Sequence, residues 1–275
     1  MTARPLGRRV LRLKREITDV DTAVLVSLHK LRLLTTDQLR RLHVGDGDMR
    51  ATLRRTQVRL KRLHDLKLVI RLSRVVGGVR AGSSGYVYGL TGWGQAVLEV
   101  GGTFGGRRRR MWEARPYFQD HMLAVSELCV RLVEADRGHH LELLDFQGEP
   151  QCWRYLSGPG GEVVPIKPDA FVRVATGDFE HRAFAEVDLG TESLPTILRK
   201  SQRYVDYWRS GEEQRRHGVF PKVVWLVPDD RRQVGIEKAL GRLALEAQDL
   251  FAVGLLEDGP HMLVPAAGAR GRGPP

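Results

Sequence analysis

Three carboxylates close to the ends of two predicted strands are the residues best placed to do chemistry. Asp169 lies in the expected strand 168–174, and Glu186 and Asp188 end the next one, 183–188. Side chains alternate along a strand, so Glu186 and Asp188 point to one side, where Asp169 can meet them. Three such groups would repel one another without a cation, and Mg²⁺ or Mn²⁺ prefers oxygen ligands. The spacing predicts a divalent-metal site at Asp169, Glu186 and Asp188.

The elements around these residues predict an α/β domain. Leu141–Phe146 should precede the two strands as a further strand, after a helix over 119–135. The elements expected after them are helix 193–209, strand 222–227, helix 231–248 and strand 251–256. Helices and strands in this order predict a mixed sheet flanked by helices.

The charge is distributed unevenly along the 275 residues, whose formal net charge is +11. Residues 1–116 hold 25 Lys and Arg against 9 Asp and Glu, a net +16, whereas residues 117–275 hold 19 against 24, a net −5. Such asymmetry indicates one part that binds a polyanion and another with a different task. A solvated basic surface in an arginine-rich protein is the alternative, since arginine outnumbers lysine 36 to 8.

The basic part has the element order of a winged helix-turn-helix domain, which it resembles over residues 17–100. Expected helices start at Asp19 or Asp21, at Gln38 and at Met49. Two strands, 68–76 and 86–90, follow with a Gly/Ser-rich turn between them, and a helix over 93–100 ends the domain.

The long third helix of this part is the candidate DNA surface. Its arginines 55, 59 and 62 recur opposite a leucine stripe, and an α-helix of this kind fits the major groove of duplex DNA. The candidate DNA-binding residues are Arg50, Arg54, Arg55, Arg59, Lys61, Arg62, Arg71 and Arg74. The last two belong to the expected wing, where they would contact phosphates. A domain that mainly binds protein is also possible, because winged helices serve as interaction modules.

Composition sets the remaining boundaries. We expect a basic arm over 1–16, a linker over 101–116, a second domain over 117–265 and a disordered tail over 266–275. The chain has ordinary globular composition, two cysteines, no apolar run of membrane-spanning length and no secretory signal pattern at its start. A cytoplasmic protein without a membrane partner is expected, its oligomeric state left open.

The motif Pro168-Asp169, followed after 17 residues by Glu186-Val187-Asp188, resembles the core of PD-(D/E)xK nucleases. Together with the winged helix and the run EVDLGTES…RKSQRYVDYW, it resembles the replication-relaxation family of plasmids and other mobile elements. The resemblance implies a restriction-endonuclease-like domain. It also implies a protein that binds double-stranded DNA, alone or with other replication or transfer proteins, and nicks or cleaves it with a divalent metal during replication or transfer.

The sequence departs from the nuclease pattern at one position, because Asp188 stands where PD-(D/E)xK nucleases have their lysine. Lys200 is the first replacement, since it lies on the next expected helix, four residues before Tyr204 and on the same face. Lys167, on the strand face of Asp169, is the second. The expected catalytic residues are Asp169, Glu186, Asp188 and Lys200.

The role of Glu127 and the function of the protein each leave alternative hypotheses open. Glu127, in the helix before the sheet, could approach the metal or simply be a solvated side chain. The departure at Asp188 also allows a catalytically inactive initiator, regulator or accessory factor that uses a nuclease-like fold, or a structural partner in a larger complex.

Overall fold

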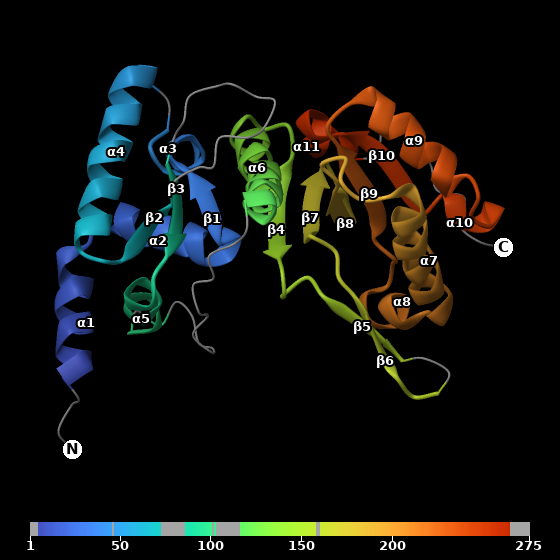
Figure 1. The fold of residues 1–275 in the computed structure, drawn as a ribbon, viewed down its shortest axis with the longest axis horizontal. Coiled ribbons are helices and arrows are strands. Elements are labelled where there is room, and N and C mark those ends of the chain that lie inside the picture. Colours follow the sequence, from blue (N-terminus) through green and yellow to red (C-terminus); the bar gives the residue numbers. More distant parts are fainter. Residues whose placement is uncertain are drawn as a thin grey trace. The chain divides into compact units, whose positions relative to one another are not determined.

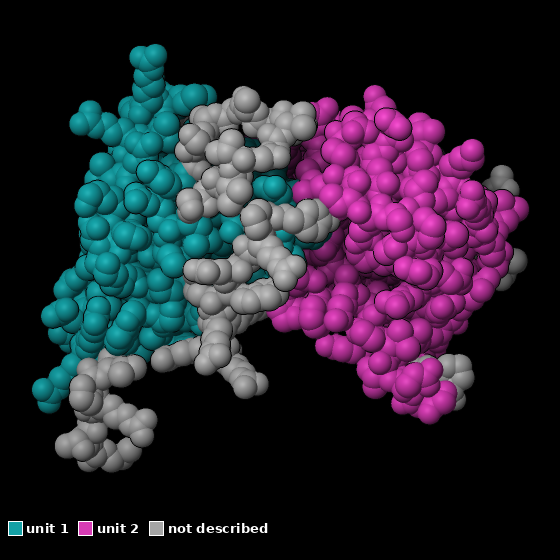
Figure 2. All heavy atoms as spheres, viewed as in Figure 1, with its two compact units in different colours: residues 1–130 teal, residues 131–275 magenta. Residues whose placement is uncertain are grey.

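The computed structural model describes residues 5–45, 47–72, 86–100, 102, 116–157 and 160–264. The chain forms two compact units, Met1–Val130 and Arg131–Pro275, shown in Figure 2. The division falls inside helix α6 (Pro116–Arg137), whereas the sequence places a linker just before it, at 101–116. That linker and the tail 266–275 lie almost wholly outside the described residues, so the domain boundaries stay a prediction.

Unit 1 combines helices with a small antiparallel sheet of order β1-β3-β2 (Figure 1). Its elements are α1 (Pro5–Glu16), α2 (Asp19–Leu31), β1 (Leu33–Thr35), α3 (Thr36–His43), α4 (Met49–Asp65), β2 (Val69–Leu72), β3 (Val87–Leu90), α5 (Gly92–Val100) and the first part of α6. The expected helices and strands are present, but the basic arm is helical from Pro5 onward and β1 was not expected. The wing turn and Arg74 lie outside the described residues, so the winged-helix assignment is taken up below as a proposal.

A buried aspartate fixes the start of α2 against α4. Thr18 caps α2: the Asp21 carboxylate accepts the Thr18 N–H at 2.8 Å, and Thr18 Oγ1 accepts the Asp21 N–H at 3.2 Å. The fully buried Asp21 also pairs with Arg59 Nη1 at 2.7 Å and with Arg62 Nη1 at 2.9 Å. Burial opposes its ionisation, but the Thr18 amide and Arg59 outweigh burial and lower the pKa of Asp21.

Two of the candidate DNA-binding residues, Arg59 and Arg62, belong to this cluster. Both guanidinium groups neutralise Asp21, and Arg62 also donates to the Glu16 carbonyl. Burying a carboxylate without a partner is costly, so the ion pairs with Asp21 fix the positions of both guanidinium groups.

We expect Asp21→Ala to lower the free energy of unfolding by about 2–3 kcal/mol, because it removes the Asp21 half of the capping box and leaves two arginines without their counter-charge. Asp19→Ala, an exposed position in the same first turn, is the matched control and should change stability by less than about 0.5 kcal/mol. Because the pKa of Asp21 is lowered, its contribution should be complete above the ordinary value of 3.8 and should be lost at lower pH. Urea denaturation across pH measures both effects, and equal stability of the two variants would contradict the assignment.

Unit 2 is built on a mixed five-stranded sheet of order β10-β9-β8-β7-β4, which confirms the predicted α/β class (Figure 1). Neighbouring strands are parallel for β10/β9 and β9/β8, and antiparallel for β8/β7 and β7/β4. The strands are β4 (Glu142–Gly148), β7 (Ala170–Thr176), β8 (Phe179–Val187), β9 (Lys222–Val227) and β10 (Phe251–Leu255). The strands β5 (Arg154–Ser157) and β6 (Val163–Ile166) form a separate antiparallel hairpin. The helices are α7 (Leu194–Ser210), α8 (Glu212–His217), α9 (Asp230–Leu240), α10 (Leu245–Gln248) and α11 (Gly259–Met262), and a 3₁₀ turn spans Leu256–Asp258. The single helix expected over 231–248 is thus two helices, α9 and α10.

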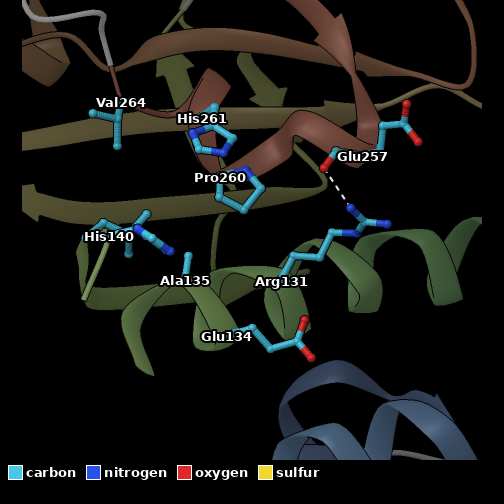
Figure 3. Close-up of a pocket in the computed structure, with 9 residues that line it drawn as sticks. Arg131, Glu134, Ala135, His140, Glu257, Pro260, His261 and Val264 are labelled. Atoms are coloured by element: carbon cyan, nitrogen blue, oxygen red, sulfur yellow. Dashed lines mark hydrogen bonds between the residues drawn. The ribbon is translucent and has the colours of Figure 1, made fainter. Parts of the chain in front are cut away.

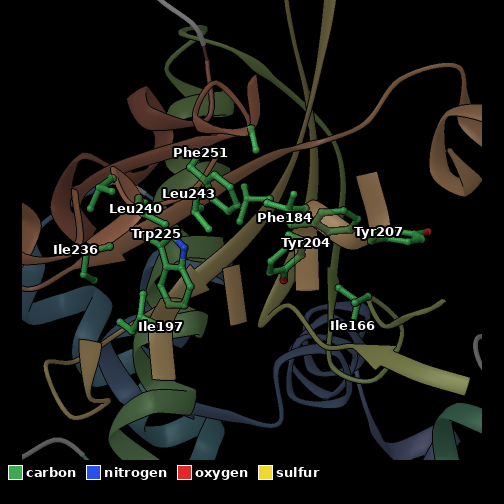
Figure 4. Close-up of a cluster of buried hydrophobic side chains, with 14 of the residues drawn as sticks. Ile166, Phe184, Ile197, Tyr204, Tyr207, Trp225, Ile236, Leu240, Leu243 and Phe251 are labelled. Carbon is green, nitrogen blue, oxygen red and sulfur yellow. The ribbon is translucent and has the colours of Figure 1, made fainter. Parts of the chain in front are cut away.

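Helices α7 and α9 pack against each other, and their apolar side chains share one core with the sheet. Phe184 and Trp225 of the sheet, Ile197 and Tyr204 of α7 and Ile236 of α9 are each at most 1% exposed and gather in this cluster (Figure 4). Alternation along β8 places Glu186 on the same face as Phe184. A carboxylate is therefore directed into the layer that α7 covers. No helix among the described ranges is long and apolar enough to cross a bilayer.

Candidate active site

Asp169 and Glu186 face each other across neighbouring strands, as the sequence predicts. The register pairs Ala170 with Ala185, and the Asp169 N–H donates to the Ala185 carbonyl at 3.1 Å. The Asp169 carboxylate accepts the Val187 N–H at 2.7 Å. Asp169 is 8% exposed and Glu186 is fully buried, so both carboxylates are largely shielded from solvent.

Two side chains of α7 hold the Glu186 carboxylate. The Tyr204 hydroxyl donates to Oε1 at 2.5 Å, and the Lys200 ammonium lies 2.6 Å from Oε2. Burial raises the pKa of Glu186, and Asp169 adds to this, whereas the Lys200 ammonium opposes it and favours the carboxylate. Burial disfavours the Lys200 ammonium, but attraction to Glu186 and Asp169 outweighs burial and raises its pKa, so Lys200 stays protonated.

The phenol of Tyr204 remains neutral in this setting. Its burial and the nearby Glu186 charge raise the pKa of Tyr204 well above 10. A neutral phenol donates a hydrogen bond but is a weak nucleophile, so Tyr204 orients Glu186 here.

The local sequence of α7 explains how these two side chains reach the sheet. Ser193 caps the helix by accepting the Thr196 N–H at 3.3 Å, and a proline follows in the first turn, where its missing N–H costs nothing. Lys200 and Tyr204 are four residues apart and so share the face toward the sheet. The Lys200 ammonium also lies 5.4 Å from the Trp225 ring centroid.

Asp188 does not join this pair, which corrects the expected three-carboxylate cluster. Its Oδ2 lies 2.5 Å from Arg232 Nε, and Arg232 also donates to the Glu192 carbonyl at 2.5 Å. Among the described residues, no group of three or more His, Cys, Asp or Glu side chains is placed to hold a metal ion. The ion pair with Arg232 compensates the Asp188 charge and holds in place the segment that leads into α7. Arg232 lies 44 residues further along the chain, and no local pattern predicted it.

The two other expected participants lie elsewhere. Lys167 is exposed, with its ammonium 4.4 Å from the Trp153 ring centroid. Glu127 belongs to unit 1, where it accepts hydrogen bonds from Arg41 at 2.7 Å and from Gln38 at 3.1 Å. It is therefore a structural acceptor, and the reading of Glu127 as a metal neighbour gains no support.

Two cavities of unit 2 differ in their relation to this site. The smaller, about 120 Å³, is lined by Pro165, Ile166, Lys167, Lys200, Arg203 and Tyr204. The larger, about 380 Å³, is lined by residues of α6, by His140 and Leu141 just after it, and by the segment 256–264 (Figure 3). Across it, Arg131 donates to the Glu257 carbonyl at 2.7 Å. Of these two cavities, only the smaller is lined by residues that contact the carboxylate pair, namely Lys200 and Tyr204.

The candidate DNA-binding residues of α4 divide into two groups. Arg50, Arg54 and Arg55 are exposed and form the first group. Lys61 is also exposed, but its ammonium forms an ion pair with the Asp65 carboxylate at 2.6 Å. On β2, Arg71 is exposed, and its guanidinium carbon lies 4.2 Å from the Tyr86 ring centroid.

Unit 2 is a mixed α/β domain with a buried acid–lysine centre. The replication-relaxation family model matches residues 25–223, and the chain belongs to this family. No curated protein matches the sequence. The solved structure of the restriction endonuclease FokI is similar at 11% identity, over 88% of this chain and 42% of that chain, with a TM-score of 0.29. The present chain thus spans less than half of FokI, and a score this low supports no argument about fold or activity.

We expect Asp188→Lys, although it recreates the lysine of the nuclease pattern, to lower the free energy of unfolding by about 3 kcal/mol, because it sets an ammonium against Arg232 in a buried position. Asp188→Asn keeps an acceptor for Arg232 and serves as the matched variant, with a smaller loss. Thermal unfolding of the two proteins measures the difference. If Asp188→Lys were as stable as Asp188→Asn, the Asp188–Arg232 pair would not hold this segment.

Proposed function

We propose that this replication-relaxation protein binds double-stranded DNA through unit 1 and cleaves a phosphodiester bond with a divalent metal at Asp169 and Glu186. The observation that carries the proposal is the position of Lys200. Its ammonium lies 2.6 Å from a fully buried Glu186 that faces Asp169. The lysine missing from the motif is thus supplied from α7.

The donor set fits a hard cation. Asp169 and Glu186 offer carboxylate oxygens from adjacent strands, and Mg²⁺ in phosphate chemistry typically uses one or two carboxylates together with waters and substrate oxygens. A third protein carboxylate is therefore unnecessary, and Asp188 is left to its ion pair. When bound, the cation would supply Lewis acidity toward the phosphoryl oxygens and a lowered pKa of the attacking water.

The chain's own residues then have separate tasks. The Val187 N–H fixes the Asp169 carboxylate, and the Tyr204 hydroxyl fixes that of Glu186. Lys200 carries a positive charge that would stabilise the charge gained by the phosphoryl group as water adds and the P–O bond breaks. The released oxygen takes a proton from solvent water.

DNA binding is assigned to the exposed cations of α4, with Lys61 and Arg71 beside them. Unlike Arg59 and Arg62, three arginines of α4 form no ion pair with any residue that the structure describes: Arg50, Arg54 and Arg55. Their guanidinium groups can therefore contact phosphates or guanine edges of duplex DNA. A winged-helix docking mode, with α4 in the major groove, is part of this proposal.

One observation favours a second function. Both oxygens of Glu186 are engaged by Tyr204 and Lys200, and the side chain is fully buried. A site held in this way also suits an inactive DNA-binding initiator or accessory factor that retains the fold, and the next experiment separates the two.

Supercoiled plasmid incubated with Mg²⁺ or Mn²⁺ should be nicked by the wild type, and Asp169→Asn and Glu186→Gln should each lose the activity, because each removes an anionic metal ligand. Lys200→Ala should lower the rate by about 10²-fold or more through lost transition-state stabilisation. Glu180→Gln, an exposed acid of the same strand, is the control and should cut normally. Cleavage by Glu186→Gln at the wild-type rate would contradict the enzymatic proposal, and an inactive wild type would leave the accessory function.

Replacing Arg50, Arg54 and Arg55 together by Ala should weaken duplex binding, and if each contacts one phosphate the log–log salt slope should fall by roughly 2–3. The matched control replaces three exposed cations of unit 2, Arg231, Lys238 and Arg242, and should keep the slope. Fluorescence anisotropy at several salt concentrations gives the slopes. An unchanged slope in the α4 variant would exclude this face as the DNA surface.

A further inference from the structure

A small cavity beside the carboxylate pair is surrounded by positive charge. Lys167, Lys200 and Arg203 line a volume of about 120 Å³ together with Pro165, Ile166 and Tyr204. The cluster is unusual in its setting, because residues 117–275 carry a net charge of −5.

Two of these three cations have no counter-charge among the residues that the structure describes. Lys200 pairs with Glu186, but Arg203 is exposed and forms no ion pair with any described residue. Lys167 is exposed and lies over the Trp153 ring, also without a carboxylate partner in the described part of the chain. Like charges gathered around a cavity repel one another, so this arrangement favours an anion inside it.

The cavity is linked to the proposed reaction centre by shared residues. Lys200 and Tyr204 line its wall and contact Glu186 directly. Lys167 lies two residues before Asp169 in the chain, and Arg203 lies one turn after Lys200 on α7. An anion held by Lys167 and Arg203 would therefore lie next to the carboxylate pair.

Resting on the proposed function, we infer that this cavity binds a phosphate of the DNA strand adjacent to the cleaved bond, with Lys167 and Arg203 as its ligands. A guanidinium presents two N–H donors that match two phosphate oxygens, and an ammonium adds a point charge. Such a contact fixes the register of the strand without reading its sequence.

An exposed aromatic ring close to the cavity favours a nucleic-acid strand over free phosphate. Tyr155 of β5 is 53% exposed and pairs in register with Pro165, which lines the cavity. Directly opposite residues of an antiparallel pair lie on the same face. A base attached to the bound phosphate could stack on such a ring, whereas inorganic phosphate gains nothing from it.

Lysine labelling of the full-length protein tests the site without requiring cleavage. A short single-stranded oligodeoxynucleotide, added without divalent cations so that it stays intact, should protect the Lys167 amine from an amine-reactive reagent, read by mass spectrometry. Lys238, exposed on α9, is the internal control and should be labelled equally with and without DNA. Arg203→Ala should abolish the protection and reduce the log–log salt slope for this strand by about 0.7, the value for one lost phosphate contact.

The matched variant is Arg199→Ala, which removes the same charge from an exposed position of α7 that does not line the cavity, and it should keep the protection. Unprotected Lys167 in the wild type, or full protection in Arg203→Ala, would overturn the inference. Equal protection by thymidine monophosphate at the same nucleotide concentration would overturn the assignment to a DNA strand. Protection without plasmid nicking would support the phosphate site while the proposed cleavage failed.

Discussion

The need to compensate the Glu186 charge inside unit 2 determines much of the surrounding structure. A fully buried carboxylate is strongly unfavourable unless it is paired and hydrogen-bonded. Both compensating groups, the Lys200 ammonium and the Tyr204 hydroxyl, come from one face of α7. The same helix packs Ile197 and Tyr204 into the apolar layer over β8 and β9. Apolar burial thus fixes the height and rotation of α7, and these in turn set the acid–lysine distance on which the proposed chemistry depends.

A second ion pair supports this arrangement at the same end of β8, between Asp188 and Arg232. Asp188 follows the strand directly and is held by Arg232 of α9, which also binds the Glu192 carbonyl just before α7. The two acids of the motif therefore have different tasks, since Glu186 faces a lysine at the proposed reaction centre and Asp188 anchors the connection. The aspartate at the usual lysine position thus has a structural partner in Arg232.

Local pattern predicted the parts of the structure that depend on local chemistry. Strand alternation and the order of elements gave the facing positions of Asp169 and Glu186, and i, i+4 spacing on α7 gave Lys200 beside Tyr204. It could not reveal partners distant in the sequence. Arg232 reaches Asp188 over 44 residues, and Asp21 recruits Arg59 and Arg62 over about 40, so one expected metal ligand and two expected DNA contacts have other partners.

The central claim is that Asp169 and Glu186, together with Lys200, form a two-carboxylate phosphodiesterase centre. A measurement of metal binding tests this claim most directly. Mn²⁺ can be titrated into the full-length protein and its free concentration followed by electron paramagnetic resonance. The account predicts saturable binding at one site, lost in Asp169→Asn and kept in Asp188→Asn, because only the first carboxylate faces Glu186. Absence of saturable binding, or binding that survives in Asp169→Asn but disappears in Asp188→Asn, would contradict it.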